Sequence, residues 1–326
     1  MFNSNASGRK IYVPAGSVSN YKSAAYWSDY ANDIIGIQSL TLNESTSNST
    51  AIQNANGQMS EVKLSGRTLY KDGDWNTLCL PFGVTDGDAD DGISLTGTPL
   101  EGATVKELDV TGQYDEDGNA VENGSYQTGI DGTTLYLYFK DASAIEAGKP
   151  YLVKWAKPDD YTAYDGTNAT SCSDIVDPVF TGVTIDAALH NVTSADNKVS
   201  FLGNYSPVSL PAGDPSNLYL GARNTLYWPS SSDRTINAFR AYFHVGTQAQ
   251  EEPVAISAFS LYFGDDEGTT GIVEMRNEGN EWNEGNKGIK GNERNAFWYT
   301  LDGRRLSGKP TKSGVYINGG RKVVVK

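Results

Sequence analysis

Short apolar runs separated by turn residues fill residues 62–264, and this alternation constrains the fold more than any other feature of the sequence. Turn pairs such as Asp72-Gly73 and Asp131-Gly132 precede runs rich in β-branched and aromatic residues, a pattern typical of strands joined by tight turns. We therefore expect an all-β fold, namely a two-sheet antiparallel β-sandwich of immunoglobulin-like or jelly-roll-like type. The expected strands are Trp75–Phe82, Val105–Val110, Ser125–Thr128, Thr133–Phe139, Pro150–Trp155, Val179–Ile185, Lys198–Leu202, Asn217–Leu220, Thr225–Trp228, Ala238–Val245 and Ala255–Phe263.

One of these runs shows how the two faces of a strand are used. Leu135, Leu137 and Phe139 share one face of the strand, whereas Tyr136 and Tyr138 share the other, because side chains alternate along a strand. We expect the first face to enter a core and the second to keep its hydroxyls in water. This alternation fits two packed sheets.

The charge of the chain argues against nucleic acid as a partner. The formal net charge is −14, and affinity for phosphates comes mainly from clustered Lys and Arg. Residues 296–326 hold seven Lys and Arg against the single Asp302, so this segment carries +6 and residues 1–295 carry −20. The basic segment at the end therefore reads as a separate unit.

The cysteines and the apolar runs limit the chain further. Cys79 and Cys172 are too few for a disulfide framework and lack the spacing of a zinc motif, although one long-range disulfide between them stays open. No apolar stretch reaches the ~20 residues that a membrane-spanning helix needs, so we expect no transmembrane segment. Residues 1–5 lack the features of a signal peptide, and we expect the native one to be missing from this chain.

The N-terminal 36 residues read as a strand followed by a helix. Residues 10–14 form the strand, which ends on a proline, and apolar residues from Val18 to Trp27 then recur at helical spacing with Ser17 as the N-cap. The stretch IYVPAGSVSNYKSAAYWSDYANDI resembles the closing repeat of the BspA-like leucine-rich-repeat surface proteins of Bacteroidetes. This resemblance covers about residues 9–36 and implies a terminal repeat remnant over 1–36.

The rest of the chain divides by composition. We expect a linker over 37–61, the sandwich over 62–265, a flexible linker over 266–295 and a small β tail over 296–326. The tail resembles the C-terminal sorting tails of secreted Bacteroidetes proteins in its D-G-R turn, its G-V-Y-I strand and its final K-V-V-V-K. That resemblance implies export and attachment to the cell surface.

Phrases inside the expected sandwich, such as YKDGDWNTLCLPF and AGKPYLVKW, resemble a module that often follows such repeats in Bacteroidetes surface proteins. The leading interpretation is thus a non-enzymatic, cell-surface or secreted adhesin-like protein, which we expect to be a monomer with the sandwich as a spacer or ligand-binding module. Its expected partner is a host protein or a glycan. A carbohydrate-binding accessory domain and a glycoside hydrolase with a carboxylate pair are the alternatives.

The histidines and carboxylates give little indication of a catalytic or metal site. His190 and His244 are the only histidines and neither has the neighbours of a catalytic base, so we predict no catalytic residue. Asp86, Asp88 and Asp90 place carboxylates two residues apart, as calcium loops do, but the glycine and glutamate of an EF-hand are not at their positions. We expect weak calcium binding at most, and no other cofactor.

Aromatic side chains are the better candidates for contact with a ligand. Tyr227 and Trp228 precede a flexible polar loop, so we expect this pair at the surface. Tyr136 and Tyr138 are the second candidate pair, because they share the expected outer face of their strand. These four residues are the predicted ligand-binding set.

Overall fold

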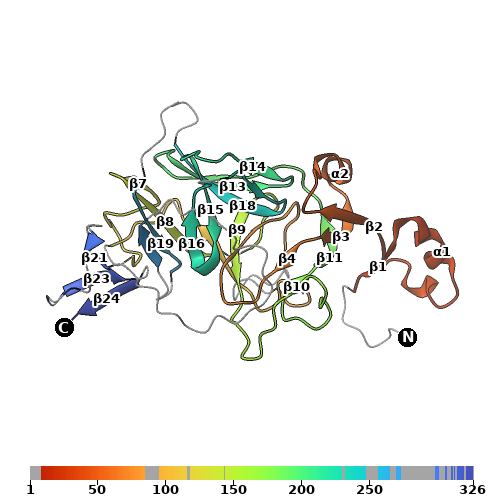
Figure 1. Cartoon of the computed structure of the whole chain (residues 1–326). Helices are drawn as coiled ribbons and strands as arrows, with labels where there is room; N and C mark the ends of the chain where they lie inside the picture. Colours follow the sequence, from red (N-terminus) through yellow and green to blue (C-terminus); the bar gives the residue numbers. More distant parts are fainter. Residues whose placement is uncertain are drawn as a thin grey trace.

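The structure is a computed structural model, drawn in Figure 1. It is mostly β, with several antiparallel sheets and, within the described residues, no barrel, so the all-β prediction is confirmed. The N-terminal elements β1 and α1 lie at one end of the chain's body, and β7, β8 and β19 lie at the other. The described residues are 9–84, 95–115, 118–142, 144–229, 232–246, 256–264, 269–272, 298–300, 305–306, 310, 312, 314–318 and 321–325.

The first part of the chain has the expected strand and helix. Strand β1 (Ile11–Pro14) is followed by the 3-10 turn η1 (Ala15–Ser17), helix α1 (Val18–Ser23) and the 3-10 turn η2 (Ser28–Tyr30). Ser17 occupies the N-cap position of α1, although its side chain makes no capping hydrogen bond. The helix is shorter than the pattern predicted, because it ends before Ala24, which has extended backbone angles.

The prediction of a linker over 37–61 is wrong. Strand β2 (Ile34–Asn43) runs parallel to β1, helix α2 (Ser49–Ala55) follows it, and β3 (Met59–Ser65) pairs parallel with β2. The polar composition hid this unit, because only Ile52 and Ala55 anchor the helix in the core, with exposures of 1% and 5%. Two apolar residues one helical turn apart are enough to fix one face of so short a helix.

The largest sheet has seven strands in the order β20-β19-β8-β6-β9-β5, and β7 pairs with β8 outside this path. Not all of its pairs are antiparallel as expected, because β19 runs parallel to β8. Strand β20 lies inside the segment predicted as a flexible linker and pairs with β19; residues 273–295 lie outside the described residues. The strands are β5 (Asn76–Cys79), β6 (Thr104–Leu108), β7 (Gly129–Asp131), β8 (Thr134–Asp141), β9 (Pro150–Lys154), β19 (Ala258–Tyr262) and β20 (Thr269–Ile272).

A second large sheet has five strands in the order β12-β13-β18-β15-β16. Its members are β12 (Val192–Thr193), β13 (Val199–Asn204), β15 (Asn217–Gly221), β16 (Thr225–Tyr227) and β18 (Arg240–Val245). The smaller pairings join β4 (Thr68–Leu69) to β10 (Ile175–Val176), β14 (Val208–Leu210) to β17 (Arg234–Ile236), and β11 (Val179–Thr184) to β3, while η3 (Ala222–Asn224) precedes β16.

The two large sheets share a core. Leu135, Leu137 and Phe139 of β8 are fully buried in one cluster with Phe201 of β13 and Phe243 of β18. The Phe139 ring lies edge-on to both of these rings, at centroid distances of 6.2 and 6.4 Å. The prediction that this face of β8 enters a core is confirmed.

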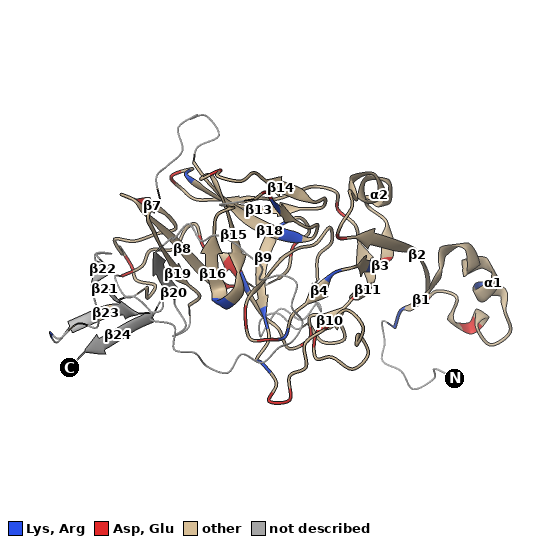
Figure 2. Ribbon diagram, viewed as in Figure 1, with Lys and Arg blue, Asp and Glu red and all other residues tan. Residues whose placement is uncertain are grey.

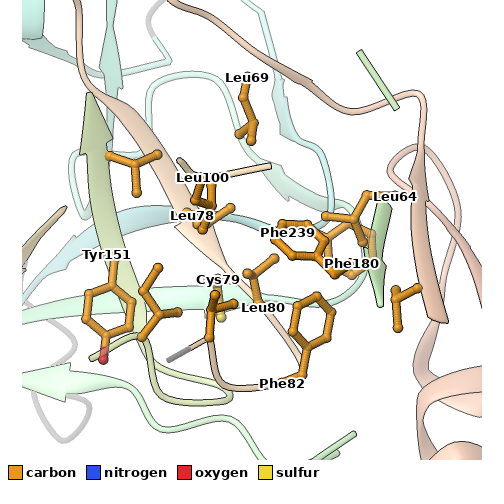
Figure 3. Packing of buried hydrophobic residues seen from close by; sticks show 14 of the residues in the cluster. Leu64, Leu69, Leu78, Cys79, Leu80, Phe82, Leu100, Tyr151, Phe180 and Phe239 are labelled. Atoms are coloured by element: carbon orange, nitrogen blue, oxygen red, sulfur yellow. The ribbon is translucent and has the colours of Figure 1, made fainter. Parts of the chain in front are cut away.

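The strands β1, β2, β3 and β11 form a four-stranded sheet, which we call the N-terminal sheet. A second cluster joins this sheet to the large sheets, and Figure 3 shows its centre. Leu64 of β3 and Phe180 of β11 pack there with Cys79 of β5 and with Phe239, which precedes β18. Cys79 is fully buried, and both cysteines are free thiols, so the disulfide left open by the sequence is not formed. Burial raises the pKa of the Cys79 thiol to about 12, which suits a packing role.

The C-terminal strands pair with one another, as expected for a small β tail. Their order is β22-β21-β23-β24, and all three pairs are antiparallel. Asn318 at the end of β23 pairs with Arg321 at the start of β24. The strands are β21 (Trp298–Thr300), β22 (Arg305–Leu306), β23 (Gly314–Asn318) and β24 (Arg321–Val325).

Charged residues are spread over many elements, and Figure 2 shows acidic and basic positions interspersed along the described ribbon. The longest helix among the described residues, α2, has seven residues. In the part of the chain that the structure describes, no helix is long and apolar enough to cross a membrane.

Candidate functional site

Tyrosines gather on the outer face of the seven-stranded sheet, opposite the shared core. Tyr136 and Tyr138 leave β8 on the face opposite Leu137, and Tyr262 of β19 lies beside Tyr138 in the strand register. The neighbouring Leu135 and Leu137 are fully buried on the inner side. Strand alternation thus places three tyrosines on one outer surface.

Two further tyrosines, Tyr114 and Tyr126, complete what we call the tyrosine array. The Tyr138 ring stacks on Tyr114 at a centroid distance of 3.9 Å and on Tyr262 at 4.7 Å, with interplanar angles of 11° and 4°. Tyr136 is nearly parallel to Tyr138 at 6.4 Å, and Tyr126 is tilted against Tyr136 at 5.5 Å. The ring faces in the middle of the array are therefore occupied by neighbouring rings.

Tyr114 and Tyr126 belong to a covering loop, residues 109–115 and 118–128, that lies over this face. The two residues exchange backbone hydrogen bonds, with N–H to O=C distances of 2.8 and 3.1 Å. Gly118 has φ +87°, and a side chain there would collide with the Tyr262 ring. Glycine is required because the backbone lies directly against that ring.

Asp109 anchors the covering loop. Its carboxylate is buried and accepts hydrogen bonds from the Tyr114 hydroxyl at 2.7 Å, from the Thr111 N–H and hydroxyl, and from the Gly112 N–H. Lys140 also reaches it, at 3.3 Å. Burial alone would raise the pKa of Asp109, but the hydrogen bonds and the Lys140 charge outweigh it and lower the pKa to about 2.

Lys140 connects Asp109 to a second carboxylate, Glu107 of β6. Glu107 lies 3.7 Å from the Lys140 ammonium and 2.6 Å from that of Lys149, which also contacts Glu146 at 3.1 Å. Both carboxylates are thus held by fixed cations. A general acid needs a raised pKa, and the lowered pKa of Asp109 is the opposite of this.

The exposure of the array differs from the expectation that both tyrosine hydroxyls stay in water. Tyr138 is 1% exposed, and its hydroxyl has no hydrogen-bond partner among the described residues. Burial raises its pKa. The covering loop explains the difference, because Tyr114 packs on the ring from outside. Tyr126, Tyr136 and Tyr262 are half-buried, so only the margin of the array is accessible.

Tyr227 and Trp228 do not form a joint surface pair. Tyr227 is half-buried, stacks on Tyr219 at 5.8 Å and packs beside Leu210 and Ile236, on the outer side of the five-stranded sheet. Trp228 is also half-buried but packs against the core that the two large sheets share, and its indole nitrogen is buried. Successive residues of a strand face opposite sides, and this separates the two rings.

The histidines have no catalytic partners in the described part of the chain. The Nδ1 atom of His244 lies 3.1 Å from the amide oxygen of Asn217, and His190 is exposed. No hydrogen bond joins either ring to a described carboxylate. The geometry matches a hydrogen-bonded strand histidine.

The predicted calcium ligands Asp86, Asp88 and Asp90 lie outside the described residues. Within the described ranges, no group of three or more His, Cys, Asp or Glu side chains is arranged to hold a metal ion. Burial, with the nearby charges of Asp74 and Asp174, raises the pKa of Asp72. A raised pKa is the property that a general acid needs.

The sequence analysis did not identify Tyr114, Tyr126, Tyr262 or Asp109 as site residues. Part of the pattern was present, because Tyr126 and Tyr262 lie in predicted strands.

Comparisons of the chain with protein-family models, with curated proteins and with solved structures give no match. The candidate site therefore rests on its own geometry.

Proposed function

We propose that this chain is a non-catalytic, extracellular binding module, an adhesin-like part of a cell-surface or secreted protein, and that it contacts its ligand at the margin of the tyrosine array. The observation that carries the proposal is the stack of four nearly parallel tyrosines ending in half-exposed rings. Rigid aromatic side chains lose little entropy on binding and dominate recognition surfaces.

The rest of the fold supports a carrier role. We interpret the two large sheets as the layers of a β-sandwich, which would hold the array on a stiff base through their shared core. The three parallel strands β1, β2 and β3, with helical segments between them, support the interpretation of residues 1–36 as a remnant of a repeat unit. The resemblance to BspA-like surface proteins and to Bacteroidetes sorting tails supports export and surface attachment.

The proposal is tested by adhesion. Beads coated with the full chain are expected to bind a layer of fixed epithelial cells, and Tyr136→Ala is expected to lower the bound fraction several-fold. Tyr26→Ala is the matched control, because Tyr26 is 85% exposed and lies between α1 and η2, outside the tyrosine array. Equal adhesion of wild type and Tyr136→Ala would show that the tyrosine array is not the contact surface. No adhesion of the wild type would contradict the binding function itself.

The hydrolase alternative has its own test. Asp72 is the described residue that it would use as an acid, with Asp74 or Asp174 as the second carboxylate. Release of reducing ends from a polysaccharide by the wild type, lost in Asp72→Asn, would replace the binding function with catalysis. We expect no such release.

A further inference from the structure

The accessible margin of the tyrosine array is its outer end, because the central rings stack on one another. Tyr114, Tyr138 and Tyr262 use their faces on one another, and the Gly118 backbone lies against Tyr262. Tyr126 and Tyr136 form the outer end, where two half-buried rings meet at 46°. A ligand here therefore meets a small aromatic corner, with apolar ring surface and hydroxyl groups side by side.

The strand β7 and the covering loop that border this corner carry exposed polar side chains. Asp131, at the end of β7, is exposed and pairs with Thr134 in the strand register, which places it on the same face as Tyr136 of the neighbouring strand β8. The covering loop adds exposed neutral amides and hydroxyls, from Gln113, Asn119, Asn123, Ser125 and Gln127. Val121 is its single large apolar side chain that is well exposed, at 40%.

The charge around the corner selects among ligand classes. Lys140, on the same face of β8 as Tyr136, is held by Asp109 and Glu107, so its positive charge is already paired. A polyanion would also meet the exposed carboxylates of Asp131 on β7 and of Glu122 on the covering loop. The net charge of −14 adds to this repulsion. A protein partner would need a larger apolar centre than Val121 and two half-buried rings provide.

We propose that the corner formed by Tyr126, Tyr136 and Asp131 binds a neutral polysaccharide. The apolar face of a pyranose ring packs on the Tyr136 and Tyr126 rings, while the Asp131 carboxylate and the tyrosine hydroxyls exchange hydrogen bonds with sugar hydroxyls. Asp109 is a positioning residue, because it fixes Tyr114 and so holds the covering loop that carries Tyr126. This inference rests on the proposed binding function and names its ligand class.

Native gel electrophoresis of the full chain tests it, with galactomannan, yeast mannan or mixed-linkage β-glucan cast into separate gels and heparin in a further gel. The wild type is expected to be retarded by at least one neutral polysaccharide and not by heparin. Tyr136→Ala and Tyr126→Ala are expected to weaken the retardation about tenfold, and Tyr26→Ala to leave it unchanged.

Tyr126 also packs within the covering loop, so its loss could disturb the fold, and Asp131→Ala is measured beside it. This variant removes an exposed carboxylate and keeps every ring. It is expected to weaken retardation several-fold with an unchanged melting temperature, whereas Asp131→Asn retains most of it. Equal retardation of wild type and Asp131→Ala would overturn the assigned contact.

The outcomes separate the ligand class from the binding function. No retardation in any neutral gel, or retardation by heparin alone, would overturn the neutral-polysaccharide assignment. If beads still adhere to cells in that case, and adhesion survives periodate oxidation of the cell layer but not protease treatment, the ligand is a protein and the binding function stands. If the beads do not adhere either, both fail.

Discussion

Arg67 gives the sharpest test of how this fold is held together. It lies between β3 and β4, is fully buried, and donates hydrogen bonds from Nη1 to the Thr68 carbonyl at 2.8 Å and from Nη2 to the Thr77 carbonyl at 2.9 Å. Thr77 belongs to β5, so one guanidinium joins the N-terminal sheet region to the seven-stranded sheet. Burial lowers the pKa of Arg67, and Glu44, which pairs with Arg240 at 2.9 Å, is the carboxylate near it.

Replacement of Arg67 by methionine keeps much of the volume and removes the donors. Each buried carbonyl left without a donor costs about 1–3 kcal/mol, and the two together cost roughly 2–6 kcal/mol. Removing a buried cation returns part of this, because the desolvated charge is itself unfavourable. We expect a net loss of about 3 kcal/mol in the free energy of unfolding, which lowers the melting temperature by roughly 6–12 °C.

Urea denaturation followed by tryptophan fluorescence, together with calorimetry, measures this change. Arg67→Lys is the graded variant, because an ammonium keeps the charge but cannot reproduce the two-pronged contact, so it should fall between wild type and Arg67→Met. Lys22→Met is the control, since Lys22 is an exposed cation in α1. If Arg67→Met is within 1 kcal/mol of the wild type, the buried carbonyls do not depend on this side chain and the reasoning fails.

Three further predictions concern the tyrosine array. Tyr138→Phe should leave stability unchanged or raise it by up to about 1 kcal/mol in urea denaturation, because the buried hydroxyl has no described partner; a clear loss would reveal one. Gly118→Ala should cost about 1–3 kcal/mol in the same assay, because φ is +87° and the Tyr262 ring lies against the backbone; a neutral result would mean that the covering loop yields easily. Asp109→Asn should cost about 2 kcal/mol at pH 7, because the folded pKa of Asp109 is about 2 and the ordinary value is 3.8. A carboxyl whose pKa is lowered in the folded state stabilises the fold at a pH above its unfolded-state pKa, and this stabilisation is lost as the pH falls through the folded-state pKa. The difference in free energy of unfolding between wild type and Asp109→Asn should therefore shrink between pH 4 and pH 2. A constant difference would contradict the lowered pKa.

Strand alternation carried most of what could be predicted. The inner face of β8 was identified from Leu135, Leu137 and Phe139 because a period of two leaves little choice once one face is apolar. Turn residues indicated the strand borders, as in β8, which follows Asp131-Gly132. Strand alternation and turn residues are local properties, so they can be predicted from the sequence alone.

The remaining predictions failed because they depended on contacts between residues that are distant in the sequence. Tyr138 alternates like a solvent-facing residue, but Tyr114, from a separate loop, covers it. Nothing near Tyr138 in the sequence signals that contact. Helix α2 was missed for a similar reason, because the Asn48 amide donates hydrogen bonds to the carbonyls of Asn43, Thr46 and Tyr205, and the last of these residues is distant in the sequence.

Strand β9 explains why ligand binding at the tyrosine array should also stabilise the N-terminal sheet. Its Tyr151 and Val153 lie in the cluster that joins the N-terminal sheet, whereas Leu152 lies in the core shared by the two large sheets. One strand therefore stabilises both cores at once, and neither can open without exposing the other. A ligand that binds only the folded array should accordingly protect backbone amides of β9 and β3 from hydrogen exchange, as well as those of β8. Protection confined to β8 and the covering loop would instead mean that the two cores open independently.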